Sequence, residues 1–187
     1  MTLTKFFKNF KPDNISQTYH AGHLALDIVS EGKGLINGYG KPLCAPEQCL
    51  VLGISGDTYS PDNHTAITKG YGVRLRGMET GHEYLFWHCM PLFPVWGGQT
   101  VQRGQIVAYM ANSGNVYMGT KYVPIEQRLV PPYRGTHLHF EMFKGGNRIS
   151  PLSHINWSWE PNYTLFDQMK AFVVVLEKAV KLRKGIF

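Results

Sequence analysis

A series of short apolar runs separated by Gly, Pro and Asn is the feature that most limits how this chain folds. Several runs are rich in β-branched and aromatic residues, and turn residues follow them at close intervals. The expected strands are Leu24–Val29, Cys49–Ile54, Tyr71–Arg76, Glu83–His88, Ile106–Met110 and His137–Phe143. This pattern favours an antiparallel sheet over βαβ units, so we expect a mainly β domain with a twisted antiparallel sheet.

The length of the chain fits one domain with short appendages. A hydrophobic content of 43% and a charged content of 17% argue against extended disorder in these 187 residues. We expect a polar lead-in over residues 1–19, a central domain over residues 20–152 and an extension over residues 153–187.

The carboxyl-terminal extension has a helical periodicity. The residues that recur at helical spacing are Leu165, Met169, Phe172, Leu176 and Val180. Gly185 follows the last periodic turn, so a helix is expected from about residue 164. Two roles are open for it, a helix packed on the domain or a docking or membrane-surface helix, and packing is the simpler interpretation.

Two segments are too long for simple turns. Residues 30–43 are rich in glycine, and residues 115–135 hold three prolines and end just before His137. Long loops in a compact domain are usually functional or disordered. We expect the second segment to border a substrate groove.

The net charge of +6 and the pI near 9.2 suit nucleic acid, anionic lipid or anionic wall polymers as partners. No basic helix or aromatic RNA-binding motif is present, which argues against nucleic acid. No run reaches the roughly 18 apolar residues of a transmembrane segment, and lysines interrupt the apolar runs at the amino terminus. We therefore expect synthesis in the cytoplasm without a signal peptide.

Three cysteines, Cys44, Cys49 and Cys89, are present. An odd number without a secretory signal favours reduced thiols over disulfides. None has the close paired spacing of a thiolate zinc site. We expect all three thiols to be unpaired, and buried inert cysteine is the simpler interpretation of each.

The densest chemical motif is Gly135-Thr136-His137-Leu138-His139-Phe140-Glu141. Alternate residues of a strand share one face, so His137 and His139 would lie about 6–7 Å apart and could bracket a metal and its water. Two surface histidines on an edge strand are the alternative.

Two further sites strengthen the metal interpretation. His23 and Asp27 are four residues apart near the first expected strand, and a carboxylate in so apolar a strand needs a partner. His88 ends another apolar strand, where it could move protons or stabilise a transition state, or be an ordinary core histidine. Imidazole and carboxylate donors are those that a hydrolytic zinc site uses.

The order of these motifs resembles that of the lysostaphin-type zinc endopeptidase family. The matching segments are His23-xxx-Asp27, Trp87-His88, Gly98-Gln99-Thr100-Val101-Gln102-Arg103-Gly104-Gln105-Ile106-Val107-Ala108-Tyr109, His137-Leu138-His139-Phe140-Glu141 and the closing Ile149-Ser150-Pro151-Leu152. The resemblance covers about residues 20–152. The chain departs from the family pattern at Ala25, where glycine is usual, and in the longer segments after Asp27 and before His137.

The resemblance implies a role for each site residue. His23, Asp27 and His139 would ligate Zn²⁺. His137 would act as general base on the bound water, and His88 would polarise or orient the tetrahedral oxyanion, although the division between these two is open. Tyr19 is a candidate oxyanion or substrate contact, for which an ordinary packed tyrosine is the simpler interpretation.

The resemblance also implies a zinc-dependent endopeptidase that hydrolyses peptide bonds in bacterial cell-wall peptidoglycan. A wall enzyme without a signal peptide suggests a phage lysis or virion-associated enzyme, or export by another route. The alternative is a catalytically silent domain that binds the wall or serves a virion as a structural part that retains zinc.

Overall fold

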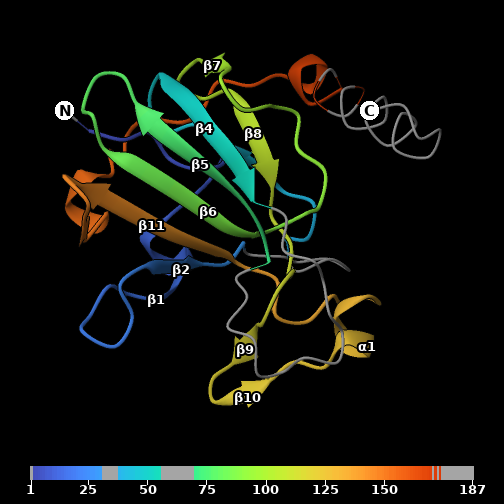
Figure 1. Cartoon of the computed structure of the whole chain (residues 1–187). Helices are drawn as coiled ribbons and strands as arrows, with labels where there is room; N and C mark the ends of the chain where they lie inside the picture. The colour runs from blue at the N-terminus through green and yellow to red at the C-terminus, as the bar shows by residue number, and fades with distance from the viewer. Residues whose placement is uncertain (1, 31–37, 56–69, 170, 172, 174–187) are drawn as a thin grey trace.

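The computed structural model describes residues 2–30, 38–55, 70–169, 171 and 173. Its main element is an eight-stranded sheet in the order β1-β2-β11-β6-β5-β4-β7, with β12 paired to β11. Every recorded pairing in this sheet is antiparallel. Figure 1 shows the long strands β4, β5, β6 and β11 side by side across the molecule. The expected mainly β fold with an antiparallel sheet is therefore confirmed.

The bounds of the strands are β1 Ile15–Gln17, β2 Leu26–Ile28, β3 Pro42–Cys44, β4 Cys49–Ser55, β5 Tyr71–Gly77, β6 Glu83–Cys89, β7 Thr100–Val101, β8 Ile106–Tyr109, β9 Tyr117–Met118, β10 Lys121–Tyr122, β11 Leu138–Lys144 and β12 Asn147–Ile149. The short helices are η1 Pro12–Asn14, α1 Ile125–Arg128 and η2 Leu152–His154. All six strands expected from the sequence are present, with ends shifted by at most two residues.

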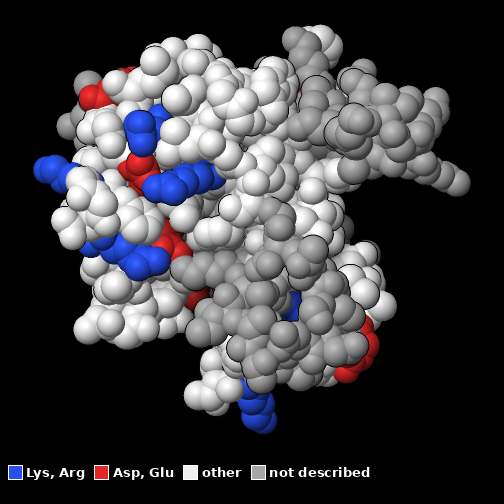
Figure 2. Space-filling model, viewed as in Figure 1, with Lys and Arg blue, Asp and Glu red and all other residues white. Residues whose placement is uncertain are grey.

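The two faces of the sheet differ in chemistry because side chains alternate along each strand. Phe140 of β11 lies opposite Phe86 of β6, and both are fully buried in the core. The next pair along the same strands, His139 opposite Trp87, points to the other face. This outer face carries the charged side chains over β5, β6 and β11, where Lys and Arg lie among Asp and Glu (Figure 2).

The amino-terminal segment belongs to the core, which corrects its description as a polar lead-in. Leu3, Phe6 and Phe10 are at most 1% exposed. The Phe6 ring lies 4.3 Å from that of Phe140 and 5.9 Å from that of Phe86, measured between centroids. Lys8 and Lys11 are exposed, whereas Lys5 is buried and its ammonium group pairs with Glu160. Residues 3–7 are therefore buried in succession.

Residues 115–135 form an ordered insertion. It contains the hairpin of β9 and β10, the single turn of α1 and a cis peptide bond between Pro131 and Pro132. In Figure 1 the insertion projects below the end of the main sheet. The strands β3 and β8 form a second small sheet, and β8 contacts β5 and β6 of the main sheet.

The carboxyl-terminal helix begins at residue 165, close to the expected position. Its described apolar side chains do not pack as expected, because Leu165 is 72% and Met169 is 58% exposed. The buried contacts of this region come from Tyr163 and Ala171. The remaining periodic residues, Phe172, Leu176 and Val180, lie outside the described residues or have undescribed side chains.

None of the described helices is long and apolar enough to cross a bilayer. Cys44, Cys49 and Cys89 are free and buried, as expected. Burial raises the pKa of the Cys49 thiol to about 12, and it raises the pKa of Cys44 and Cys89 further still. High pKa values keep these thiols protonated and unreactive near neutral pH.

The contrast between the two ends of the chain gives a stability test. Replacing Leu3 by Ala should lower the free energy of unfolding by about 2–5 kcal/mol, because it leaves a cavity in the core. Replacing Leu165 by Ala, the matched change at an exposed position, should alter it by less than about 0.5 kcal/mol. Urea denaturation followed by tryptophan fluorescence measures both, and equal effects would contradict the assignment of the amino terminus to the core.

Candidate metal centre

The pairing of β2 with β11 creates the centre of the site. Asp27 lies directly opposite His139 in this antiparallel register, and His23 precedes Asp27 by four residues. Asp27 Oδ1 is 2.8 Å from His139 Nδ1 and 3.2 Å from His23 Nε2. One ligand atom from each of the three residues lies within 4.8 Å of the others, so the three could hold a metal ion together.

The chemistry of these donors fits a metal. His23 Nδ1 donates to the carbonyl oxygen of Thr18 at 3.3 Å, which leaves the lone pair on Nε2. His23 Nε2 is buried and has no hydrogen-bond partner, although it faces Asp27. An unsatisfied buried acceptor is costly unless a cation or proton occupies the space before it. This atom is the observation that best supports a metal site here.

His88 and His137 stand beside the three candidate ligands. The centroids of their rings are 4.5 Å apart, and His88 is 5.8 Å from the ring of His139. His137 Nε2 is 3.9 Å from Asp27 Oδ1. The site thus brings together all five of the histidine and carboxylate residues that the sequence had suggested.

Backbone carbonyls hold both of these rings. His88 Nδ1 donates to the carbonyl of Ser113 at 2.7 Å, and His137 Nδ1 donates to the carbonyl of Gly135 at 2.8 Å. A carbonyl can only accept, so each neutral ring carries its proton on Nδ1 and its lone pair on Nε2. His88 also has a φ of +60°, a left-handed conformation that is uncommon for a residue other than glycine and that clusters at functional sites.

Burial and neighbouring charges set the ionisation of the site. Burial raises the pKa of Asp27, but the hydrogen bond from His139 and the nearby imidazoles outweigh it and lower the pKa. Burial lowers the pKa of His88 well below its usual value, and the neighbouring His137 and His139 act in the same direction. Burial also lowers the pKa of His137, against the opposing effect of Asp27. At neutral pH the site therefore holds an ionised carboxylate and two neutral imidazoles.

Glu141, which the sequence motifs did not single out as a site residue, lies beside the three candidate ligands. Its carboxylate is 1% exposed, lies 3.4 Å from His139 Nε2 and accepts a hydrogen bond from Arg148 Nε at 2.7 Å. Because His139 Nδ1 faces Asp27, Glu141 occupies the position of an outer carboxylate that orients a metal-binding imidazole. The strand period from His139 to Glu141 is the signal that places both on one face.

Tyr19 has a structural contact. Its hydroxyl donates to the carbonyl of Arg148 at 3.0 Å, and its ring packs against the hydrophobic core. It is not among the described residues that line the groove. A direct contact with substrate stays a prediction for this residue.

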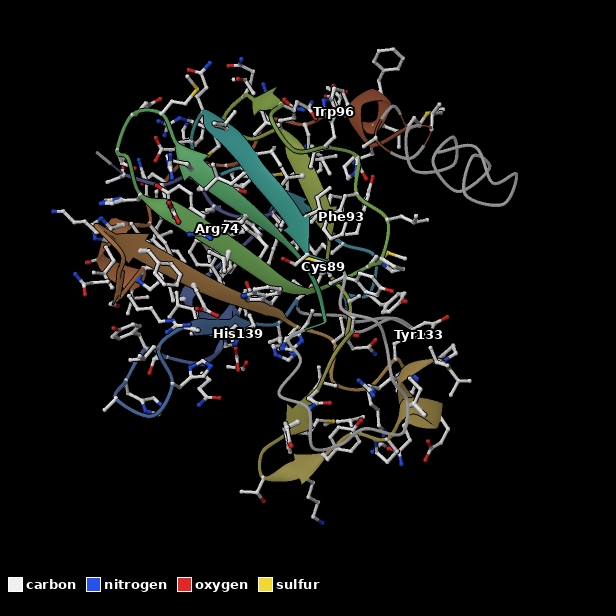
Figure 3. All side chains as sticks on the ribbon, in the orientation of Figure 1. Arg74, Cys89, Phe93, Trp96, Tyr133 and His139 are labelled. Atoms are coloured by element: carbon white, nitrogen blue, oxygen red, sulfur yellow. The ribbon has the colours of Figure 1, made fainter. Side chains whose placement is uncertain are left out.

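The five site residues line a groove of about 870 Å³. One wall comes from Ser16, Gln17 and residues 29–30, and the other comes from residues 115–119 and 135–136 of the insertion. In Figure 3, His139 lies on the sheet and Tyr133, which is not among the groove-lining residues, lies on the insertion. The insertion borders the groove, as its position before His137 had suggested. Apart from Asp27 and the histidines, the described lining residues are uncharged.

Several solved structures share this fold. LytU matches with a TM-score of 0.51 and 21% identity over 79% of this chain and 87% of its own. Csd3 from Helicobacter pylori matches with a TM-score of 0.51 and 19% identity over 96% of this chain and 40% of its own. Lysostaphin in solution matches with a TM-score of 0.51 and 15% identity over 87% of this chain and 60% of its own.

The comparison confirms the lysostaphin-type fold that the sequence motifs had suggested. Comparison with protein-family models and with curated protein sequences gave no match. The assignment of individual residues therefore rests on the geometry of this site.

The position of Glu141 leads to a prediction that does not depend on catalysis. Replacing Glu141 by Gln should weaken the binding of Zn²⁺ by about 10–100-fold, the usual effect of losing an outer carboxylate. Competition with a chromophoric zinc chelator measures this affinity. Glu83→Gln is a matched control, because Glu83 lies on the same face and pairs with Arg74 and Arg76 instead. Equal losses in both variants would contradict a specific role for Glu141.

Proposed function

We propose that this chain is a zinc-dependent endopeptidase that hydrolyses peptide bonds in bacterial cell-wall peptidoglycan. The observation that carries the proposal is the cluster of His23, Asp27 and His139 with His88 and His137 beside it at one groove. Fold similarity gives further support, since lysostaphin shares the fold and is described as an antimicrobial peptidase from Staphylococcus simulans.

Zinc suits the donor set better than harder divalent cations. Two imidazole nitrogens and one carboxylate oxygen form a common ligand set of catalytic zinc sites, which leave a fourth position for water or substrate. Magnesium and calcium prefer sites made of oxygen atoms. When bound, zinc lowers the pKa of a coordinated water toward about 7 and polarises the scissile carbonyl.

His137 is suited to act as the general base. Its proton is fixed on Nδ1 by the carbonyl of Gly135, so Nε2 can accept a proton from an attacking water. Asp27 Oδ1, 3.9 Å from that nitrogen, stabilises the imidazolium that forms. The protonated ring can then donate to the amine that leaves.

His88 is suited to hold the reacting groups in place. In the neutral ring Nε2 is an acceptor, so it can bind a hydrogen of the attacking water. Only the protonated ring can donate from Nε2 to a tetrahedral oxyanion, because Nδ1 is already bound to the carbonyl of Ser113. Charge stabilisation of this kind is a large term in acyl transfer.

Substitutions separate metal binding from catalysis. Asp27→Ala and His139→Ala should lose zinc and cleavage together, because each removes a metal ligand. His88→Ala and His137→Ala should keep about one zinc per chain while cleavage falls by about 10²-fold or more. The measurements are elemental analysis of the purified protein and mass spectrometry of fragments released from peptidoglycans with different cross-bridges.

A matched control and three outcomes make this test decisive. His154→Ala changes a histidine outside the site and should leave both zinc content and cleavage unchanged. Loss of zinc from His137→Ala with retention in His139→Ala would exchange the two roles. Full cleavage by His88→Ala and His137→Ala would place the chemistry elsewhere. One zinc per chain without cleavage in the unaltered protein would favour the silent or structural alternative.

A phage lysis or virion-associated role stays a prediction from the sequence. Immunodetection of the protein in purified virions and in lysates tests it directly. Absence from both would contradict this role without affecting the proposed chemistry.

The insertion should determine which walls are cut. Tyr117 and Met118 are 52% and 54% exposed and line the groove, so the double substitution Tyr117→Ser and Met118→Ser should change the relative cleavage of different peptidoglycans several-fold. Zinc content should stay the same. Leu129→Ser is the control, because Leu129 is exposed on the same insertion but does not line the described groove. Unchanged selectivity in the double variant would remove the hairpin from the substrate site.

A further inference from the structure

A buried arginine fastens the insertion to the body of the domain. Arg128 ends α1 and is 2% exposed, an unusual position for a residue that always carries a positive charge. Its NH1 group donates to the carbonyls of Asn112, at 3.2 Å, and Gly114, and its NH2 group donates to the hydroxyl of Tyr122 at 3.0 Å. A buried charge persists only when hydrogen bonds of this kind compensate its desolvation.

The contact between Arg128 and residues 112–114 is reciprocal. The side-chain amide of Asn112 donates to the backbone carbonyls of Arg128, at 3.1 Å, and Arg134, at 3.0 Å. Asn112 is itself 6% exposed. Each segment therefore binds backbone groups of the other, which fixes the path of the chain on both sides of Ser113.

Ser113 connects these hydrogen bonds of Arg128 and Asn112 to His88 of the candidate site. Its carbonyl accepts the hydrogen bond from His88 Nδ1, and its hydroxyl donates to the carbonyl of Cys89 at 2.7 Å. The backbone amide of Tyr71 donates to the same hydroxyl at 2.9 Å. The peptide that holds His88 thus lies between two carbonyls, those of Asn112 and Gly114, that point to the Arg128 guanidinium.

We propose that Arg128 is a positioning residue for His88, acting from the insertion through the carbonyl of Ser113. The inference rests on the proposed function, since it assigns a catalytic role to His88. Arg128 fixes the direction of the neighbouring peptides, the Ser113 carbonyl then keeps the proton of His88 on Nδ1, and Nε2 keeps its lone pair. The same guanidinium also donates to the hydroxyl of Tyr122, which is not among the described residues that line the groove.

The backbone at His88 has an unfavourable conformation that the surrounding contacts must maintain. His88 has a φ of +60°, a left-handed conformation that is costly for a residue other than glycine. Such conformations persist when surrounding contacts over-determine them. Removal of the two carbonyl contacts would allow the peptides of residues 112–114 to rotate, and the Ser113 carbonyl would no longer select one tautomer of His88.

The test measures the His88 ring directly. In protein labelled with ¹⁵N-histidine, long-range ¹H–¹⁵N spectra show which ring nitrogen carries the proton, and His88→Gln assigns the signal. The zinc-loaded wild type should show His88 protonated at Nδ1. Arg128→Met should lose this single tautomer and lower kcat by about 10–100-fold, the scale of a small misplacement of a catalytic group. Zinc content should stay near one per chain.

Two further variants distinguish positioning from general support of the fold. Arg128→Lys keeps a charged donor and should restore part of the Nδ1-protonated signal and part of kcat. Tyr122→Phe removes only the hydroxyl contact and should leave the His88 signal and kcat within about twofold of wild type. Thermal unfolding of each variant shows whether it is folded, and Arg128→Lys serves for both measurements if Arg128→Met does not fold.

The outcomes separate this inference from the proposed function. An unchanged His88 tautomer and kcat in folded Arg128→Met, or an equal loss in Tyr122→Phe, would overturn the inference. If Arg128→Met does not fold, a His88 tautomer signal and a kcat equal to those of the wild type in Arg128→Lys would also overturn the inference. Absence of cleavage by the zinc-loaded wild type would instead count against the proposed function. The spectra would still show whether Arg128 determines which ring nitrogen of His88 carries the proton.

Discussion

The antiparallel pairing of β2 with β11 is the interaction on which the site depends. It places Asp27 opposite His139 although 112 residues separate them in the chain. A shift of this register by one residue would turn one of the two side chains into the core, because the faces of a strand alternate. The buried residues on either side, Leu26 and Ile28 of β2 with Leu138 and Phe140 of β11, prevent such a shift. The hydrophobic core therefore specifies the geometry of the polar site.

A second constraint comes from the backbone. Carbonyl oxygens of Thr18, Ser113 and Gly135 each accept a hydrogen bond from the Nδ1 atom of one histidine. These oxygens belong to segments outside the long strands, so the connecting segments determine which nitrogen of each ring carries the proton. The hydrogen bonds between the insertion and residues 112–114 therefore matter for the site, because a rotation of the Ser113 peptide would alter the hydrogen bond to His88.

Much of this architecture follows from the sequence, and the exceptions have physical causes. Alternating apolar runs locate the strands of the sheet because one face of each strand is buried. The burial of Phe6 and Phe10 was not predicted because lysines lie between and beside them, and because a segment with little regular structure has no periodicity that would reveal burial. Leu165 and Met169 were misjudged in the opposite sense, since helical spacing of apolar residues does not say what covers them. The roles of Ser113 and Gly135 depend on their carbonyls, which every residue possesses, so no residue type reveals them.

The arrangement of charges explains why these residues form one unit. The ionised carboxylate of Asp27 faces the lone pair of His23 Nε2 at 3.2 Å, and no hydrogen lies between them when the proton of His23 is on Nδ1. Two electron-rich atoms at this distance repel each other in a poorly solvated site. A divalent cation in contact with both converts the repulsion into attraction, and the outer pair of Glu141 and Arg148 holds the third donor in place. The protein fold thus keeps the donors close together at a cost in free energy that metal binding would offset.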